Sequence, residues 1–284
     1  MLRPSRAVWG SFETFHIGVK RQQSGDDVTR SNISVQLYTV RELAAEDLGA
    51  TLQRLADVGF TQVEPYAFTA FSPALGEGLR AAGLTAPTTH ERLVDKSDSE
   101  LDAIFAHAAQ LGIATVIDPQ VHVSRWQDAA SVRQIAEALN MAGVIASQHG
   151  VGVGYHNHAH EIASTIDGVT AIEYLATLLD PAVGLEIDSY WAAVGGQDPV
   201  ALLERLGERV IAVHVKDGPP SADNTDQVAV GAGAMPIAQI IAASPQALHV
   251  IELDDSSGDR FEAVAESFAF LSALGAAAPA APAG

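Results

Sequence analysis

The chain has 284 residues, contains no cysteine and is poor in basic residues. The absence of cysteine excludes disulfide frameworks, thiolate zinc sites and cysteine nucleophiles. The 16 Lys and Arg residues stand against 35 Asp and Glu residues, a net charge of −19. This charge disfavours a nucleic-acid partner, because phosphate binding normally needs a basic surface. No apolar run approaches the ~20 residues of a membrane span, so we expect a cytoplasmic protein without a membrane partner.

The two ends differ in composition from the rest of the chain. Residues 1–30 carry five basic and three acidic side chains, a net charge of +2 that leaves −21 for the remainder. Their apolar residues are scattered, which disfavours a secretory, twin-arginine or organelle leader. We therefore expect an N-terminal extension over 1–30, one folded domain over 31–275 and an Ala/Pro-rich tail over 276–284.

Between these ends, short apolar runs alternate with amphipathic helical patterns. Such alternation is typical of βαβ units with a parallel sheet, and eight units in this length favour a single (β/α)₈ TIM barrel over a doubly wound sheet. Ser97 with Glu100 has the pattern of a capping box, and Asp198 precedes another helical run. The eight expected strands are 33–38, 61–65, 84–89, 114–117, 151–155, 183–187, 210–215 and 248–253.

Histidines and carboxylates follow these apolar runs, at the strand ends where a parallel barrel presents its active-site residues. The most informative segments are YHNHAHE (155–161), LEIDSYW (185–191), HVKDG (214–218) and IELD (251–254). From four different strands they offer two imidazoles and two carboxylates as metal ligands: His156, Asp188, His214 and Glu252. Mixed nitrogen and oxygen donors suit Mn²⁺, Co²⁺, Zn²⁺ or Fe²⁺ better than Mg²⁺. We expect one divalent cation, with Mn²⁺ as the first candidate.

Plainer interpretations stay open at this point. The histidines of 155–161 could belong to an ordinary polar loop, and Asp188 could serve only as the N-cap of the following turn. Glu252 is harder to explain in this way. It lies within an apolar strand, where a carboxylate is costly unless it is paired or metal-bound.

In their order and spacing, these four segments resemble the sugar phosphate isomerase/epimerase superfamily of xylose-isomerase-like TIM barrels, over roughly residues 32–275. The resemblance implies one divalent metal at the top of the barrel, held by the four ligands named above. It also implies proton-transfer roles for His158, Lys216 and Glu252, with His158, Lys216 or a metal-bound water as the base. Residues expected at the substrate are Glu64, His90, Glu161 and Trp191, the last as a surface on which a sugar ring stacks.

One departure from the family pattern concerns His156. Ketose 3-epimerases of this superfamily usually have glutamate there, and that glutamate and the one matching Glu252 move protons on opposite faces of the sugar carbon. A histidine in this place disfavours such a two-carboxylate epimerisation. We therefore expect one-sided proton removal beside a carbonyl through a metal-stabilised enediolate, as in isomerisation. The alternative is a lyase or dehydratase that uses the same intermediate for β-elimination on a keto-sugar, keto-glycoside or inosose.

The charge of the domain also bears on the substrate. A field of this sign opposes anionic ligands, so a free sugar, keto-sugar or cyclitol is favoured over a sugar phosphate. Two other functions agree less well with the sequence. A non-catalytic sugar-binding barrel predicts a broken ligand set, and a DNA-repair endonuclease of this fold needs a basic surface. A homo-oligomer is possible, because members of the superfamily often form dimers or tetramers.

Overall fold

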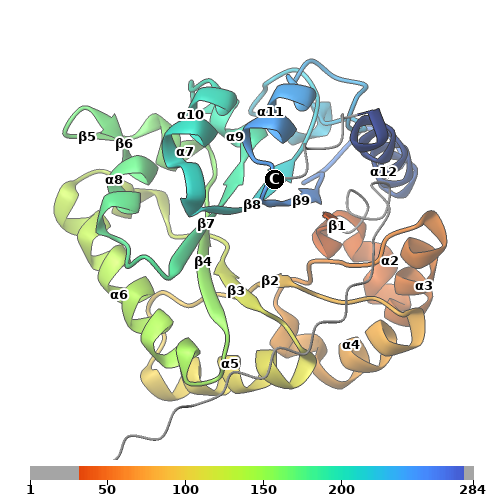
Figure 1. The fold of residues 1–284 in the computed structure, drawn as a ribbon, viewed down its shortest axis with the longest axis horizontal. Helices are drawn as coiled ribbons and strands as arrows, with labels where there is room; N and C mark the ends of the chain where they lie inside the picture. Colours follow the sequence, from red (N-terminus) through yellow and green to blue (C-terminus); the bar gives the residue numbers. More distant parts are fainter. Residues whose placement is uncertain (1–31, 278–284) are drawn as a thin grey trace, which may run out of the picture.

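Seven parallel strands curl into a barrel, and the helices lie around its outside (Figure 1). The computed structural model describes residues 32–277, so the expectations for 1–30 and for all but the first two residues of 276–284 lie outside the described residues. The strands, in sheet order, are β1 (Ile33–Val35), β9 (Leu248–Ile251), β8 (Val210–Val215), β7 (Val183–Asp188), β4 (Gly152–His156), β3 (Thr115–Asp118) and β2 (Thr88–His90). A separate antiparallel pair consists of β5 (Thr165–Ile166) and β6 (Val169–Thr170).

The stretch 61–66 occupies the eighth strand position, between β1 and β2. The Glu64 amide donates to the Val35 carbonyl (2.8 Å), and the His90 amide donates to the Pro65 carbonyl (2.8 Å). These contacts form single bridges rather than a ladder, in keeping with the missing N–H of Pro65. The stretch closes the barrel, and the predicted (β/α)₈ TIM barrel is confirmed.

Helices follow the strands as the sequence predicts. The capping box of Ser97 and Glu100 starts α5, and the Asp198 side chain accepts from two backbone amides at the start of α10. The α-helices are α2 (Arg41–Glu46), α3 (Leu48–Val58), α4 (Phe68–Ala82), α5 (Asp98–Leu111), α6 (Ala129–Ser147), α7 (Ala159–Ala163), α8 (Ala171–Leu178), α9 (Ser189–Val194), α10 (Pro199–Leu206), α11 (Ile237–Ala243) and α12 (Arg260–Ala277). The short 3₁₀ helices are η1 (Leu37–Val40), η2 (Val123–Trp126), η3 (Gly207–Arg209) and η4 (Asn224–Asp226). Within residues 32–277 no helix has the length and apolar character of a membrane span.

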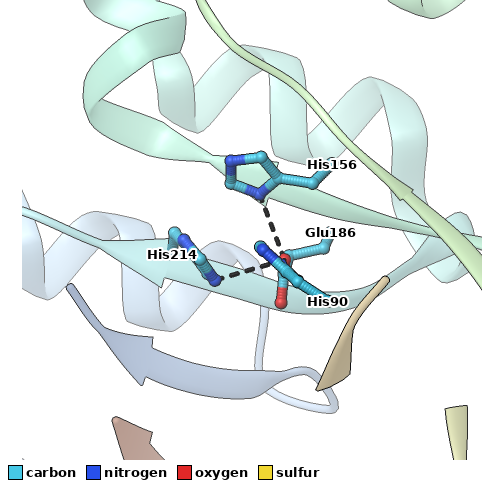
Figure 2. A group of neighbouring side chains, drawn as sticks. All are labelled: His90, His156, Glu186 and His214. Atoms are coloured by element: carbon cyan, nitrogen blue, oxygen red, sulfur yellow. Dashed lines mark hydrogen bonds and ion pairs between the residues drawn. The ribbon is translucent and has the colours of Figure 1, made fainter. Parts of the chain in front are cut away.

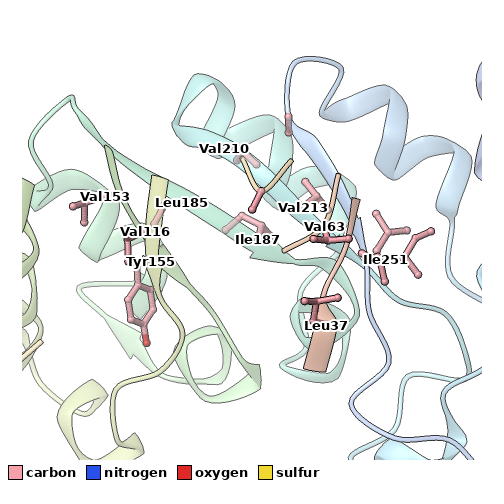
Figure 3. Close-up of a cluster of buried hydrophobic side chains, with 14 of the residues drawn as sticks. Leu37, Val63, Val116, Val153, Tyr155, Leu185, Ile187, Val210, Val213 and Ile251 are labelled. Atoms are coloured by element: carbon pink, nitrogen blue, oxygen red, sulfur yellow. The ribbon is translucent and has the colours of Figure 1, made fainter. Parts of the chain in front are cut away.

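Alternation along the strands separates an apolar layer from the polar site. Leu185 and Ile187 of β7 belong to the main hydrophobic core (Figure 3). On the opposite face of the strand are Glu186 and Asp188. A second, small apolar cluster contains Ala212 and Val250, which precede His214 and Glu252 by two residues in the sequence. The polar groups at the top of the barrel therefore rest on an apolar layer.

A β-bulge adjusts the barrel wall directly below the site. Leu185 pairs with Val210 and Glu186 with Ala212, so Ile211 has no partner in this ladder. A Cβ added to Gly184 would lie only 2.7 Å from Ile211 Cδ1. The glycine thus makes room for the bulged side chain, in keeping with the use of bulges to re-aim side chains near active sites.

This close contact gives a testable prediction about stability. In Gly184→Ala the added methyl group overpacks the barrel, and we expect the free energy of unfolding to fall by ~1–3 kcal/mol, measured by urea denaturation. Gly49→Ala in α3 is the matched control, because its added Cβ would meet Asp47 Oδ1 at an ordinary 3.5 Å and alanine favours a helix. The control should be as stable as the parent chain or more so. Equal stability of the two variants would contradict the packing argument.

Candidate metal centre

A cavity of about 500 Å³ lies at the carboxyl ends of the barrel strands. Its wall is mixed: aromatic rings, histidines, carboxylates and one arginine all contribute. The lining residues are Tyr38, Tyr66, Ala67, His90, Glu91, Arg92, Pro119, Gln120, His156, His158, Glu252 and Asp254. The structure thus places His90, His156, His158 and Glu252 of the sequence-predicted site on the cavity wall.

The four predicted metal ligands converge in the structure. His156 ends β4, Asp188 ends β7, His214 is the last residue but one of β8, and Glu252 directly follows β9. Each offers a nitrogen or a carboxylate oxygen, and these four atoms all lie within 4.8 Å of one another. All four residues are buried. We refer to His156, Asp188, His214 and Glu252 as the outer cluster.

Asp188 caps a helix, as one of the two interpretations expects, and it keeps a second oxygen for the other. Its Oδ1 accepts a hydrogen bond from the Trp191 amide (2.8 Å) and so caps α9. Its Oδ2 lies 2.8 Å from Lys216 Nζ, on the side of the outer cluster. One oxygen therefore fixes the side chain to the helix while the other stays directed at the site.

Lys216 is buried among carboxylates. Its Nζ lies 2.8 Å from Asp188 Oδ2, 2.8 Å from Glu252 Oε2 and 2.7 Å from Asp254 Oδ2. Burial alone would lower the pKa of Lys216, but the three carboxylates raise it well above its usual value. A charged ammonium cannot take up a proton. The geometry therefore favours Lys216 as the group that holds these carboxylates in place, rather than as the base that the sequence suggested.

The charges of the outer cluster suit a divalent cation. The two carboxylates of the cluster, Asp188 and Glu252, share the single ammonium of Lys216 with Asp254. Burial raises the pKa of Asp188 to about 6 even though Lys216 opposes the shift. Burial and the nearby His214 lower the pKa of His156 to about 3, so this imidazole is neutral at pH 7 and can donate a lone pair. The residues present therefore fit a cation that prefers nitrogen and oxygen ligands.

His158 stands beside this cluster without being part of it. Its ring lines the cavity, and its Nδ1 is buried with no hydrogen-bond partner among the described residues. Burial, together with His156 and Lys216, holds the pKa of His158 well below its usual value. Glu161 fixes the position of the residue, because its Oε2 accepts from the His158 amide (2.8 Å). A neutral imidazole therefore faces the cavity on a fixed backbone.

Three residues predicted to touch substrate lie behind the cavity wall instead. Glu64, Glu161 and Trp191 are absent from the lining, and each contacts a residue that does line it. The contacts are Glu64 Oε1 to His90 Nε2 (3.3 Å), Glu161 Oε2 to the His158 amide (2.8 Å) and Trp191 Nε1 to Asp254 Oδ2 (3.1 Å). A position near a strand end predicts height in the barrel but not distance from its axis, so the sequence could not separate wall residues from supporting ones.

The site predicted from the sequence omitted several buried polar residues, of which Glu186 and Gln227 are examples. Glu186 Oε2 lies 2.6 Å from His90 Nε2, 3.1 Å from His156 Nδ1 and 3.2 Å from His214 Nε2 (Figure 2). The signal for Glu186 was present, because it shares a strand face with Asp188. Gln227, which exchanges two hydrogen bonds with Asp254, lies far along a loop and carries no such signal.

The protein is a closed parallel barrel that carries buried imidazoles and carboxylates at the carboxyl ends of its strands. It therefore belongs to the class of TIM barrels with a candidate metal centre. Within this class, the chain belongs to the xylose isomerase-like TIM barrel family, whose sequence model matches residues 27–274.

Individual relatives carry the names of two kinds of enzyme. An inosose dehydratase from Geobacillus kaustophilus is 37% identical over 95 residues, which are 33% of this chain and 28% of that protein. A sugar phosphate isomerase/epimerase structure from Parabacteroides distasonis is 24% identical with a TM-score of 0.73, over 90% of this chain and 96% of that one. The zinc-bound IOLI protein is 14% identical with a TM-score of 0.61, over 86% of this chain and 96% of that one. The structural similarities show a shared fold, and the dehydratase match spans less than a third of that enzyme.

Proposed function

We propose that the protein is a divalent-metal-dependent enzyme that removes a proton beside the carbonyl group of a small uncharged sugar or keto-sugar. The observation that carries this proposal is the convergence of His156, Asp188, His214 and Glu252 in one buried cluster next to the cavity. The bound cation would polarise the substrate carbonyl and offset the negative charge that develops when the proton leaves. The mixed donor set suits Mn²⁺, which is the first candidate, and the zinc in the IOLI structure supports Zn²⁺ as the second.

The surrounding residues support one-sided proton removal. His158 is the proposed base, because its neutral ring lines the cavity and can accept a proton. Lys216 holds the carboxylates of Asp188 and Glu252 toward the site. His90, which also lines the cavity, is the proposed contact for a substrate hydroxyl group.

The cavity wall supports an uncharged substrate. Of the residues that the structure describes, Glu91, Glu252 and Asp254 line it together with a single arginine, Arg92. The ammonium of Lys216 is already paired with three carboxylates. A phosphate group would meet a predominantly negative wall. We expect a higher kcat/KM for a free sugar than for its phosphate ester, measured at equal metal concentration. The reverse order would contradict this part of the proposal.

β-Elimination is the second candidate for the overall reaction. Two residues of the outer cluster, His156 and Glu252, line the cavity, and of these only Glu252 is a carboxylate. A reaction that moves protons on both faces of the sugar would need a carboxylate at each of the two positions. This arrangement favours removal of a proton from one face, followed by isomerisation or by loss of water from the next carbon. The match to an inosose dehydratase supports the second outcome.

Proton exchange with solvent tests the proposal and separates the two reactions. The Mn²⁺- or Zn²⁺-loaded protein would be incubated in D₂O with ketoses, 3-keto-sugars and inososes, and the products followed by NMR. Deuterium beside the carbonyl of an isomeric product indicates isomerisation, and an unsaturated ketone formed with loss of water indicates elimination. If no substrate in the panel exchanges or reacts, the enzyme proposal fails and a sugar-binding barrel becomes the better interpretation.

A further inference from the structure

Beneath the outer cluster lies a second buried layer, formed by two glutamates that the proposed reaction does not use. Glu186 precedes Asp188 by two residues on the same strand face and is therefore roughly 6–7 Å deeper along the strand. Glu64, on the bridging stretch between β1 and β2, reaches the same level, and both glutamates are fully buried. Figure 2 shows the rings of His90, His156 and His214 gathered around Glu186. We refer to Glu64 and Glu186 as the inner carboxylates.

His214 connects the two layers through opposite edges of its ring. Its Nδ1 lies 2.6 Å from Glu252 Oε2 in the outer cluster. Its Nε2 lies 2.8 Å from Glu64 Oε1 and 3.2 Å from Glu186 Oε2. Both nitrogens have a short contact, so a rotation of the ring by 180° would place carbon atoms against carboxylates on both sides.

A neighbouring amide holds Glu64, and both inner carboxylates retain spare acceptor capacity. Gln36 Nε2 donates to Glu64 Oε1 (2.9 Å) and fixes that carboxylate beside the ring. The other oxygen of each glutamate, Glu64 Oε2 and Glu186 Oε1, is buried and has no hydrogen-bond partner within the described part of the chain. The ion pairs of these carboxylates within residues 32–277 are all with histidines. Because an unpaired buried carboxylate is costly, the imidazole rings are the groups that make this layer stable.

We infer that Glu64 and Glu186 are positioning residues that make His214 present its Nδ1, and not its Nε2, to the divalent cation. The inner carboxylates accept the Nε2–H, which fixes the tautomer and the orientation of the ring and increases the basicity of Nδ1. This inference rests on the proposed metal site but not on any particular substrate or reaction. It explains why a barrel interior would keep two carboxylates below the level of the cavity.

Metal affinity and the state of His214 test the inference in the full-length chain. In Glu64→Gln and in Glu186→Gln we expect the dissociation constant for Zn²⁺ or Mn²⁺, measured by titration calorimetry, to rise ~10–100-fold. The ¹⁵N chemical shifts of His214 in the Zn²⁺-loaded parent chain should show a metal-bound Nδ1 and a protonated Nε2. Glu100→Gln is the matched control, because glutamine also suits its capping box on α5, and it should leave the affinity unchanged.

Several results would overturn the inference. Unchanged affinity in both folded variants, or a protonated Nδ1 in the loaded protein, contradicts the positioning role. Two bound ions per parent chain would show instead that the inner layer, with His90, His156, Glu186 and His214, is itself a metal site. If one glutamine variant fails to fold, the metal affinity of the other variant and the ¹⁵N shifts of His214 in the parent chain still test the positioning role. A parent chain that binds no metal at all contradicts the proposed function, which separates the two failures.

Discussion

Asp188→Asn should abolish tight metal binding while leaving the fold intact. Asparagine keeps an oxygen for the hydrogen bond from the Trp191 amide, so the N-cap of α9 survives. The substitution removes the charge that faces Lys216 and the outer cluster. We expect metal content, measured by mass spectrometry of the purified protein, to fall from about one ion per chain to a small fraction. Activity should fall by about 10³-fold or more, because the Lewis acid contributes several kcal/mol to the transition state.

The control for this experiment is the same substitution at another helix N-cap. Asp198 caps α10 and is exposed, away from the cavity. Asp198→Asn should retain both metal and activity. Full metal content in Asp188→Asn would remove this residue from the proposed ligand set, and His214→Ala would then show whether any part of the set is right.

His158→Ala should lower kcat by ~10²–10⁴-fold, the usual contribution of a general base, without reducing metal content. The side chain lies on the cavity wall, and its Nδ1 has no hydrogen-bond partner to lose among residues 32–277. Deuterium exchange into a bound keto-sugar should slow by the same factor as turnover, because both need the same proton transfer. Added imidazole should restore part of the activity by entering the space that the side chain leaves.

The surface residue His149 provides a matched histidine control. It forms an ion pair with Asp102 away from the cavity, and His149→Ala should behave as the parent chain does. Loss of metal from His158→Ala would indicate a ligand rather than a base. If His158→Ala exchanges deuterium into the keto-sugar as fast as the parent chain does, another group is the base.

Much of the fold could be predicted from the sequence because it depends on short-range patterns. Short apolar runs predicted the strands. Two capping patterns predicted where helices begin: Ser97 with Glu100 at α5, and Asp198 at α10. The stretch 61–65 was predicted as an ordinary strand, whereas it is held by single bridges because Pro65 cannot donate a hydrogen bond. The bulge at Ile211 has no pattern of its own, since it arises from the pairing of β7 with β8.

The sequence by itself determined the barrel and the height of each polar residue within it. Parallel strands bring their carboxyl ends to one face, so His156, Asp188, His214 and Glu252 had to appear at the same end. Only the tertiary structure decided how far each side chain lies from the barrel axis and which groups it contacts. Long-range contacts separated His158, on the cavity wall, from Lys216, enclosed by three carboxylates. They also placed Glu64 against His214, residues 150 positions apart whose contact no local pattern records.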